Sequence, residues 1–126
     1  MKNTFFCTNN VLPGSLAILA MAVPALAYAH AYPTHQAPSA GSTVPVSQKD
    51  VAIDFDEGVE PAFSSIAVTD AKGSSVTNGK AVVDQANNKH LSVALQALTA
   101  GTYAVAWVAL ATDGHRTQGH YSFTVK

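Results

Sequence analysis

The sequence predicts an all-β fold, an antiparallel β-sandwich or small barrel in a single small domain. Apolar and polar residues alternate over short runs, as they do in strands that bury one face. Turn signals such as Asn78-Gly79 and Asp113-Gly114 separate the runs, and Asn-Gly favours a hairpin because both residues tolerate positive φ. No convincing helical stripe of apolar residues occurs, so about seven short strands account for the domain.

The predicted strands follow one another along the chain and are marked by apolar residues at alternate positions. In order, these residues are Val51, Ile53 and Phe55; Ile66 and Val68; Leu91, Val93 and Leu95; Tyr103, Val105 and Trp107; and Tyr121, Phe123 and Val125. Val82 and Val83 add one more short apolar segment. Trp107 lies on the longest predicted strand, and we expect it to anchor the core rather than to contact a ligand.

Residues 1–29 are predicted to be a secretory signal peptide. Lys2 provides a basic start, and a mainly apolar stretch follows it. The uninterrupted apolar core, residues 16–23, is shorter than the ~20 apolar residues that span a bilayer. A basic start, a short apolar core and an Ala-Tyr-Ala ending together describe a cleaved signal. A retained membrane anchor is the alternative.

Cleavage after Ala29 leaves residues 30–126 as the mature domain, with His30 at its amino terminus; a cut after Ala27 also fits the small-residue rule. Removal of the leader takes away both methionines and the single cysteine. An exported domain without disulfides fits a bacterial periplasm better than a disulfide-rich extracellular module. The formal net charge of −1 and the lack of a basic patch give no indication of nucleic acid or anionic membrane as a partner.

The stretch Asp113-Gly114-His115 is the first candidate for chemistry. It opens the loop between the Trp107 strand and the last predicted strand, at one end of the sandwich. Residues two apart in an extended segment point the same way, so the carboxylate and the imidazole can face one point. Gly114 allows a tight turn and close approach of a ligand. Alone the motif is weak, because an aspartate followed by glycine is most often only a turn.

His30 strengthens this candidate. After cleavage it carries a free α-amine, of ordinary pKa ~8, and an imidazole, of ordinary pKa ~6.5, and the two can chelate one metal ion. His115 adds a third nitrogen and Asp113 an oxygen, a ligand set that suits Cu(II) in a tetragonal plane. Zinc accepts the same ligands but prefers a tetrahedral arrangement. The mature chain lacks the soft Met and Cys ligands that Cu(I) favours.

Four motifs occur in order along the mature chain: a first histidine followed by PSAGS, then IDFDEGVE, LTAGTYAVAW and DGHRTQG. With these motifs the chain resembles the CopC (copper resistance protein C) family of periplasmic copper-binding proteins. The resemblance implies a seven-stranded, immunoglobulin-like Greek-key sandwich that binds one Cu(II) per chain at one end. It implies that His30, Asp113 and His115 are the Cu(II) ligands and that Glu57 is an acidic residue near the copper. The methionine-rich loop of family members with a Cu(I) site is absent here, so no Cu(I) site is expected.

The other three histidines are assigned less specific positions. His35 is expected in a solvated loop, although it lies close enough in sequence to His30 to swing toward the copper. His90 follows Asn-Asn-Lys and is expected in a polar surface turn. His120 alternates with Tyr121 and is expected to face away from the core, exposed to solvent.

These observations predict a monomeric periplasmic carrier or buffer of Cu(II) in copper homeostasis or resistance, without catalysis. Its expected partners are the copper ion and an inner-membrane copper transporter. One alternative is a copper-dependent oxidative enzyme like the polysaccharide monooxygenases, which also bind copper through an N-terminal histidine. Those enzymes usually need exposed aromatics, and here only Tyr32 lies beside the site. A metal-free immunoglobulin-like interaction module is the third possibility.

Overall fold

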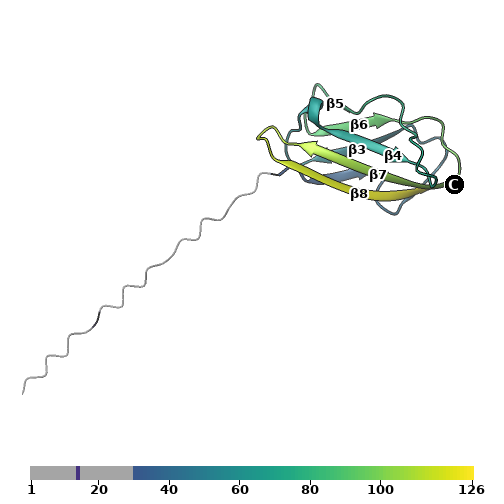
Figure 1. Ribbon diagram of the computed structural model, residues 1–126, viewed down its shortest axis with the longest axis horizontal. Helices are drawn as coiled ribbons and strands as arrows, with labels where there is room; N and C mark the ends of the chain where they lie inside the picture. The colour runs from purple at the N-terminus through teal and green to yellow at the C-terminus, as the bar shows by residue number, and fades with distance from the viewer. Residues whose placement is uncertain (1–13, 15–29) are drawn as a thin grey trace, which may run out of the picture.

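The computed structural model describes Gly14 and residues 30–126. Residues 1–29, the predicted signal peptide, and the predicted cleavage after Ala29 lie outside the described residues, apart from Gly14. Two four-stranded sheets pack face to face in the described domain, which confirms the predicted β-sandwich (Figure 1). No helix in this part of the chain is long and apolar enough to cross a membrane.

Eight strands and one short 3-10 helix, η1, make up the domain. They are β1 (Pro33–Ala37), β2 (Thr43–Val44), β3 (Asp50–Phe55), η1 (Pro61–Phe63), β4 (Ser65–Thr69), β5 (Val82–Val83), β6 (His90–Ala94), β7 (Gly101–Leu110) and β8 (Arg116–Val125). The expected strands are all present. The two strands that the sequence pattern did not reveal, β1 and β2, lie at sheet edges, where few of their residues are buried.

The two sheets have the strand orders β1-β3-β6-β5 and β2-β8-β7-β4. All neighbours are antiparallel except β2, which pairs with β8 in parallel. Each connection from β1 to β5 passes from one sheet to the other, and the chain changes sheet once more between β6 and β7, as in Greek-key sandwiches. The long β7–β8 hairpin pairs over ten residues and ends in a tight turn at one end of the sandwich.

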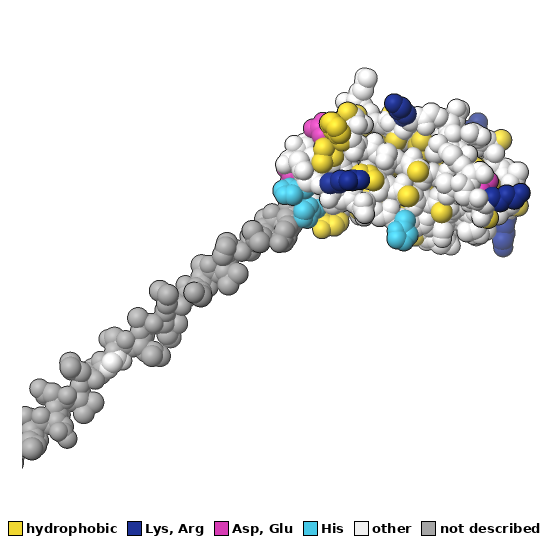
Figure 2. All heavy atoms as spheres, viewed as in Figure 1, with side chains coloured by type: hydrophobic (Ala, Val, Ile, Leu, Met, Phe, Trp, Pro, Cys, Tyr) yellow, Lys and Arg dark blue, Asp and Glu magenta, His cyan; other side chains and the backbone are white. Residues whose placement is uncertain are grey.

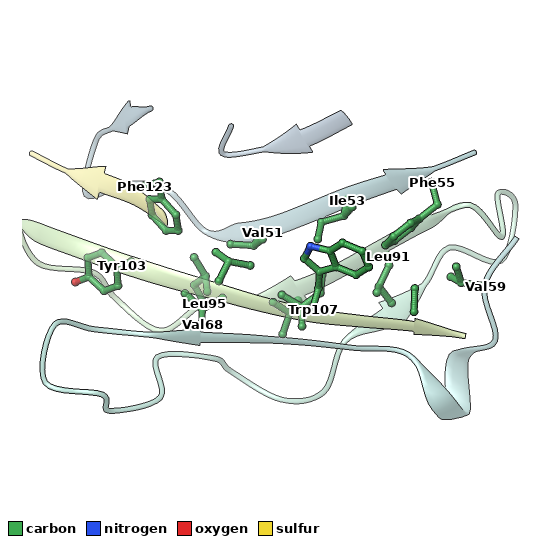
Figure 3. Packing of buried hydrophobic residues seen from close by; sticks show 14 of the residues in the cluster. Val51, Ile53, Phe55, Val59, Val68, Leu91, Leu95, Tyr103, Trp107 and Phe123 are labelled. Carbon is green, nitrogen blue, oxygen red and sulfur yellow. The ribbon is translucent and has the colours of Figure 1, made fainter. Parts of the chain in front are cut away.

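The core lies between the sheets and is filled by the alternate residues that the sequence predicted (Figure 3). Trp107 is 7% exposed, and its ring meets that of Phe55 edge-on with centroids 5.4 Å apart. Gly119 lies opposite Trp107 in the hairpin, and a Cβ there would come within 2.6 Å of the indole atom Cζ2. Close packing of this kind makes core substitutions costly. Trp107 is therefore the core anchor that was expected.

The start of the described chain and the β7–β8 turn lie at the same end of the sandwich, and the carboxyl terminus lies at the other (Figure 1). Histidine side chains gather at the first of these ends in the space-filling view (Figure 2). The fold thus brings the start of the described domain beside a loop more than 80 residues later in the sequence.

Candidate metal centre

The turn between β7 and β8 is built by backbone hydrogen bonds across five residues. The N–H of Ala111 donates to the carbonyl oxygen of His115 over 2.8 Å. The N–H of Gly114 donates to the carbonyl oxygen of Ala111 over 2.9 Å. Gly114 has φ of +92°, in the region where a side chain is strained. Glycine at this position therefore allows Asp113 and His115 to stand on either side of a tight turn.

Asp113 is held by the residue two positions later. Its Oδ1 accepts a hydrogen bond from the backbone N–H of His115 over 3.0 Å and lies 3.2 Å from the ring atom Nδ1 of the same residue. The backbone donor above all, followed by the side-chain contact with His115, holds the pKa of Asp113 below its ordinary value. Both side chains are exposed enough to meet an ion from solvent.

The backbone that follows His30 is anchored to both sheets. The side chain of Ala31 is fully buried, and its carbonyl oxygen accepts a hydrogen bond from Thr117 Oγ1 of β8 over 2.7 Å. Tyr32 donates its N–H to Asp56 Oδ1 over 2.8 Å and accepts from the Asp56 N–H over 3.0 Å. The chain is therefore fixed one residue after His30. Sequence reasoning assigned no role to Asp56 or Thr117, because both act through the backbone of a distant segment.

This anchoring places His30 beside the hairpin turn. Its ring centroid lies 5.0 Å from that of His115, and the two ring planes are 87° apart. Tyr32 meets the His30 ring edge-on at 5.8 Å. The structure thus brings together the two histidines that the sequence predicted as partners, one from the start of the described domain and one from the β7–β8 turn.

The side chains at this site do not form a closed ligand cage. Among residues 30–126, no three His, Cys, Asp or Glu side chains converge closely enough to hold a metal ion. The carboxylate of Asp113 is turned into its own loop, toward the His115 N–H. In the full chain the nitrogen of His30 is also an amide joined to Ala29, so the predicted amine ligand does not exist until cleavage.

Glu57 lies in the loop that follows β3, exposed to solvent. Its neighbour Gly58 accepts a hydrogen bond from the N–H of Thr112 over 3.0 Å, so the two loops touch. No hydrogen bond or ion pair in the described part of the chain joins Glu57 to Asp113 or His115. The acidic residue is therefore on the loop adjacent to the hairpin turn, and it forms no hydrogen bond or ion pair with the side chains of Asp113 and His115.

The predicted positions of two of the remaining histidines were wrong. His35 is exposed, as expected, but lies on β1 rather than in a loop. His90 begins β6 and is half-buried, with Nδ1 2.6 Å from Oδ1 of Asp54, so it is not a free surface residue. Both were misplaced because the pairing of separate strands is not visible in the local sequence. His120 is exposed on β8, as predicted.

Comparison with known proteins decides the family. The model of the CopC domain matches residues 34–126. The chain belongs to the CopC family. It is 39% identical over 115 residues to protein YobA of Escherichia coli strain K12, an alignment that covers 89% of this chain and 92% of YobA.

Solved structures of the family share the fold of this CopC chain. CopC from Methylosinus trichosporium OB3b has a TM-score of 0.72 and 37% identity, with 77% of this chain and 94% of that chain covered. PcoC from E. coli, described as a methionine-rich copper resistance protein, has a TM-score of 0.67 and 30% identity, with 78% and 100% covered. Residues 30–126 of this chain contain no methionine, in contrast to that description.

Proposed function

We propose that this CopC chain is a periplasmic carrier or buffer that binds one Cu(II) in copper homeostasis or resistance. The observation that supports this most is the position of His30, whose ring lies 5.0 Å from that of His115 beside the carboxylate of Asp113. The chain belongs to a family of copper-binding and copper-resistance proteins, not of enzymes. The oxidative enzyme and the metal-free module are therefore set aside.

Each of the three residues contributes a different donor. Cleavage after Ala29 would give His30 a free amine next to its own imidazole, and His115 would add a third nitrogen. Asp113 would supply the oxygen and a compensating negative charge, and its pKa lies below the ordinary value, so it is ionised at neutral pH. Three nitrogens and one oxygen match the preference of Cu(II). The role of Glu57 would be an indirect one, through its charge beside the hairpin turn.

The exposed position of the site suits a carrier. Asp113 and His115 lie on the surface, where an acceptor protein can approach and exchange ligands with the bound ion. We propose export by the signal peptide of residues 1–29, action as a monomer and transfer of copper to or from an inner-membrane transporter. The absence of Met and Cys from residues 30–126 favours Cu(II) over Cu(I) as the cargo.

Mass determination of the exported protein, followed by Cu(II) titration with electron paramagnetic resonance, tests the proposal. We expect a mass that starts at His30, one tightly bound equivalent and a spectrum of a tetragonal site with three nitrogens. Competition with a Cu(I) chelator should strip Cu(I) readily. A mature protein that starts elsewhere, or a first equivalent that binds no more tightly than to free histidine, would contradict the proposal.

A further inference from the structure

Residues 30–32, the arm, lead into β1 and lie outside the regular β1–β3 pairing. Pro33, the first residue of β1, has no N–H to donate to a neighbouring strand. The register between β1 and β3 also shifts between Pro33 and His35. The arm therefore needs contacts other than regular strand pairing to have a fixed position.

Asp56, in the loop that follows β3, supplies the first of these contacts. Its N–H donates to the Tyr32 carbonyl oxygen over 3.0 Å, and its Oδ1 accepts from the Tyr32 N–H over 2.8 Å. One residue thus binds both backbone groups of Tyr32. The side chain of Tyr32 is itself exposed to solvent, so its burial does not hold the arm. The carboxylate of Asp56 takes the place of the backbone carbonyl group that a continuing strand would offer.

Thr117 supplies the second contact, from the other sheet. It pairs with Ala109 across the β7–β8 hairpin, and directly paired residues project from the same face. Ala109 is fully buried, so Thr117 also points inward. A hydroxyl at an inward position is costly unless it forms a hydrogen bond. The Thr117 Oγ1 donates to the Ala31 carbonyl oxygen over 2.7 Å, so the arm is the partner of this inward polar group.

The two side chains act on the same peptide group. The carbonyl oxygen of Ala31 and the N–H of Tyr32 belong to one planar unit, which Thr117 holds from one sheet and Asp56 from the loop of the other. The side chain of Ala31 is fully buried as well. The arm lies at the same end of the sandwich as the hairpin turn (Figure 1). The position of the His30 ring thus follows from a peptide group that both sheets hold.

We propose that Asp56 and Thr117 are positioning residues for the metal centre. By holding the peptide group that follows Ala31, they keep the imidazole of His30 beside that of His115 and so raise the Cu(II) affinity of the centre. This inference rests on the proposed function of that centre. Neither positioning residue donates an atom to the ion. Groups that orient metal ligands in this indirect way typically change the affinity about 10–100-fold when they are removed.

Cu(II) titration of the exported protein and of two variants provides the test. Thr117→Val keeps the shape of the side chain and removes the hydrogen-bond donor, and Asp56→Ala removes the acceptor. We expect each variant to bind the first equivalent about 10–100-fold more weakly. At saturating copper the electron paramagnetic resonance spectrum should match that of the parent, because all four proposed donors remain. A changed number of nitrogens in that spectrum would contradict a purely positioning role.

Conservative variants identify the contact that matters. Thr117→Ser keeps the hydroxyl, and Asp56→Asn keeps a side-chain oxygen that can accept from the Tyr32 N–H but lacks the negative charge. Both should bind Cu(II) nearly as tightly as the parent. A loss of affinity in Asp56→Asn as large as in Asp56→Ala would show that Asp56 acts through its charge, and would overturn its role as a positioning residue.

Two residues toward the other end of the sandwich are matched controls. Thr124 lies on β8, as Thr117 does, and pairs with Thr102 near the start of β7. Asp70 follows β4, and its Oδ1 accepts the N–H groups of Lys72 and Ser74, each over 2.9 Å. Thr124→Val and Asp70→Ala should leave the Cu(II) affinity unchanged. Equal losses in these variants would show that any loosening of the fold weakens binding, and would overturn the specific role of the arm contacts.

A measurement on the copper-free protein separates failure of this inference from failure of the proposed function. The exported parent should show a nuclear Overhauser contact between the ring protons of His30 and His115, which Thr117→Val and Asp56→Ala should weaken or lose. Parent-like affinity and an intact ring contact in both variants would overturn this inference and leave the proposed function standing. A parent that shows the ring contact but binds no Cu(II) would overturn the proposed function, and with it the effect on affinity claimed here.

Discussion

The two ends of the sandwich contain different kinds of residue. At one end, the open end, His30, Asp113 and His115 stand around a hydrogen-bonded turn, and the side chains of Asp113 and His115 are open to solvent. At the other end, the closed end, the rings of Tyr103 and Phe123 stack with centroids 5.6 Å apart (Figure 3). The hydroxyl of Tyr103 also donates to the carbonyl oxygen of Thr99 over 2.8 Å.

Because of this difference, we expect one end to contribute mainly to the stability of the fold and the other mainly to copper binding. Apolar burial dominates the free energy of folding, and the closed end contributes two large aromatic rings to it. The open end contributes mainly exposed polar groups, whose loss costs the fold little. Changes at the open end should therefore alter copper binding without unfolding the domain, and changes at the closed end should do the reverse.

The largest expected effect comes from one extra residue placed before His30. The extension converts the α-amine of His30 into an amide. An amide nitrogen binds Cu(II) only after it loses a proton, and it loses that proton far less readily than an amine does. Cu(II) affinity should fall by several orders of magnitude, with the loss of one nitrogen from the spectrum, while the melting temperature of the copper-free protein stays unchanged. An extended protein that binds as tightly as the cleaved one would show that the amine is not a ligand.

The second largest expected effect is a loss of stability after a substitution at the closed end. Phe123 is buried, and Phe123→Ala should lower the free energy of unfolding by about 3–5 kcal/mol. Thermal melts measure this loss, and the milder Phe123→Leu keeps the comparison possible if the alanine variant does not fold. The Cu(II) spectrum of the folded variant should match the parent. A changed spectrum would show that the two ends are coupled through the core.

His115→Ala tests the open end from the side of the hairpin. Its affinity for the first Cu(II) should fall about 100-fold or more, because loss of an outer partner alone typically costs 10–100-fold. The melting temperature of the copper-free protein should shift little, since the side chain is exposed. Cu(II) titration of His120→Ala, also an exposed histidine of this hairpin, supplies the control. Equal losses in both variants would point to unspecific surface binding.

The smallest effect concerns Tyr121, midway along β8. Its hydroxyl oxygen is buried and has no hydrogen-bond partner in the described part of the chain, and burial raises the pKa of the phenol to about 12. Removal of an unsatisfied buried hydroxyl is neutral or stabilising, so Tyr121→Phe should gain up to about 1 kcal/mol at pH 7. Urea unfolding measures this gain.

The same residue gives a pH dependence. The folded-state pKa is above the ordinary value of 10.0, so the folded protein holds the proton more tightly than the unfolded chain. Its contribution to stability is complete below pH 10 and is lost as the pH rises to about 12. After allowance for solvent screening of a half-buried group, the loss is ~1 kcal/mol. Tyr121→Phe should flatten this part of the curve, and parallel curves for the two proteins would contradict the assignment.

Much of the fold could be predicted because burial leaves a pattern in the chain. The strand around Val51, Ile53 and Phe55 and the long hairpin strands have one buried face, which appears as alternation. The edge strand β1 buries few of its side chains, and its sequence Pro-Thr-His-Gln-Ala shows no such alternation. Its pairing depends on β3, which a local pattern does not contain.

The candidate site was predictable to a similar extent. His30 and His115 were predicted together from their chemistry, and the structure places their rings side by side. The contact between Asp54 and His90 was missed because it requires the register of two strands 36 residues apart. The inward turn of Asp113 toward its own loop was also missed, since a carboxylate can cap a turn as readily as it can face an ion.

The hydrogen bond from Thr117 to the Ala31 carbonyl oxygen has a consequence for the rate and affinity of the proposed copper binding. If the chain is cleaved as proposed, His30 would stand at the end of a tether one residue long, so its imidazole would meet that of His115 at a high effective concentration. Free histidines would lose translational and rotational freedom to reach the same geometry around an ion. In this chain that entropy is lost when the sandwich folds, before any copper arrives. A short peptide with the sequence His-Ala-Tyr would keep the proposed copper ligand and lack this advantage.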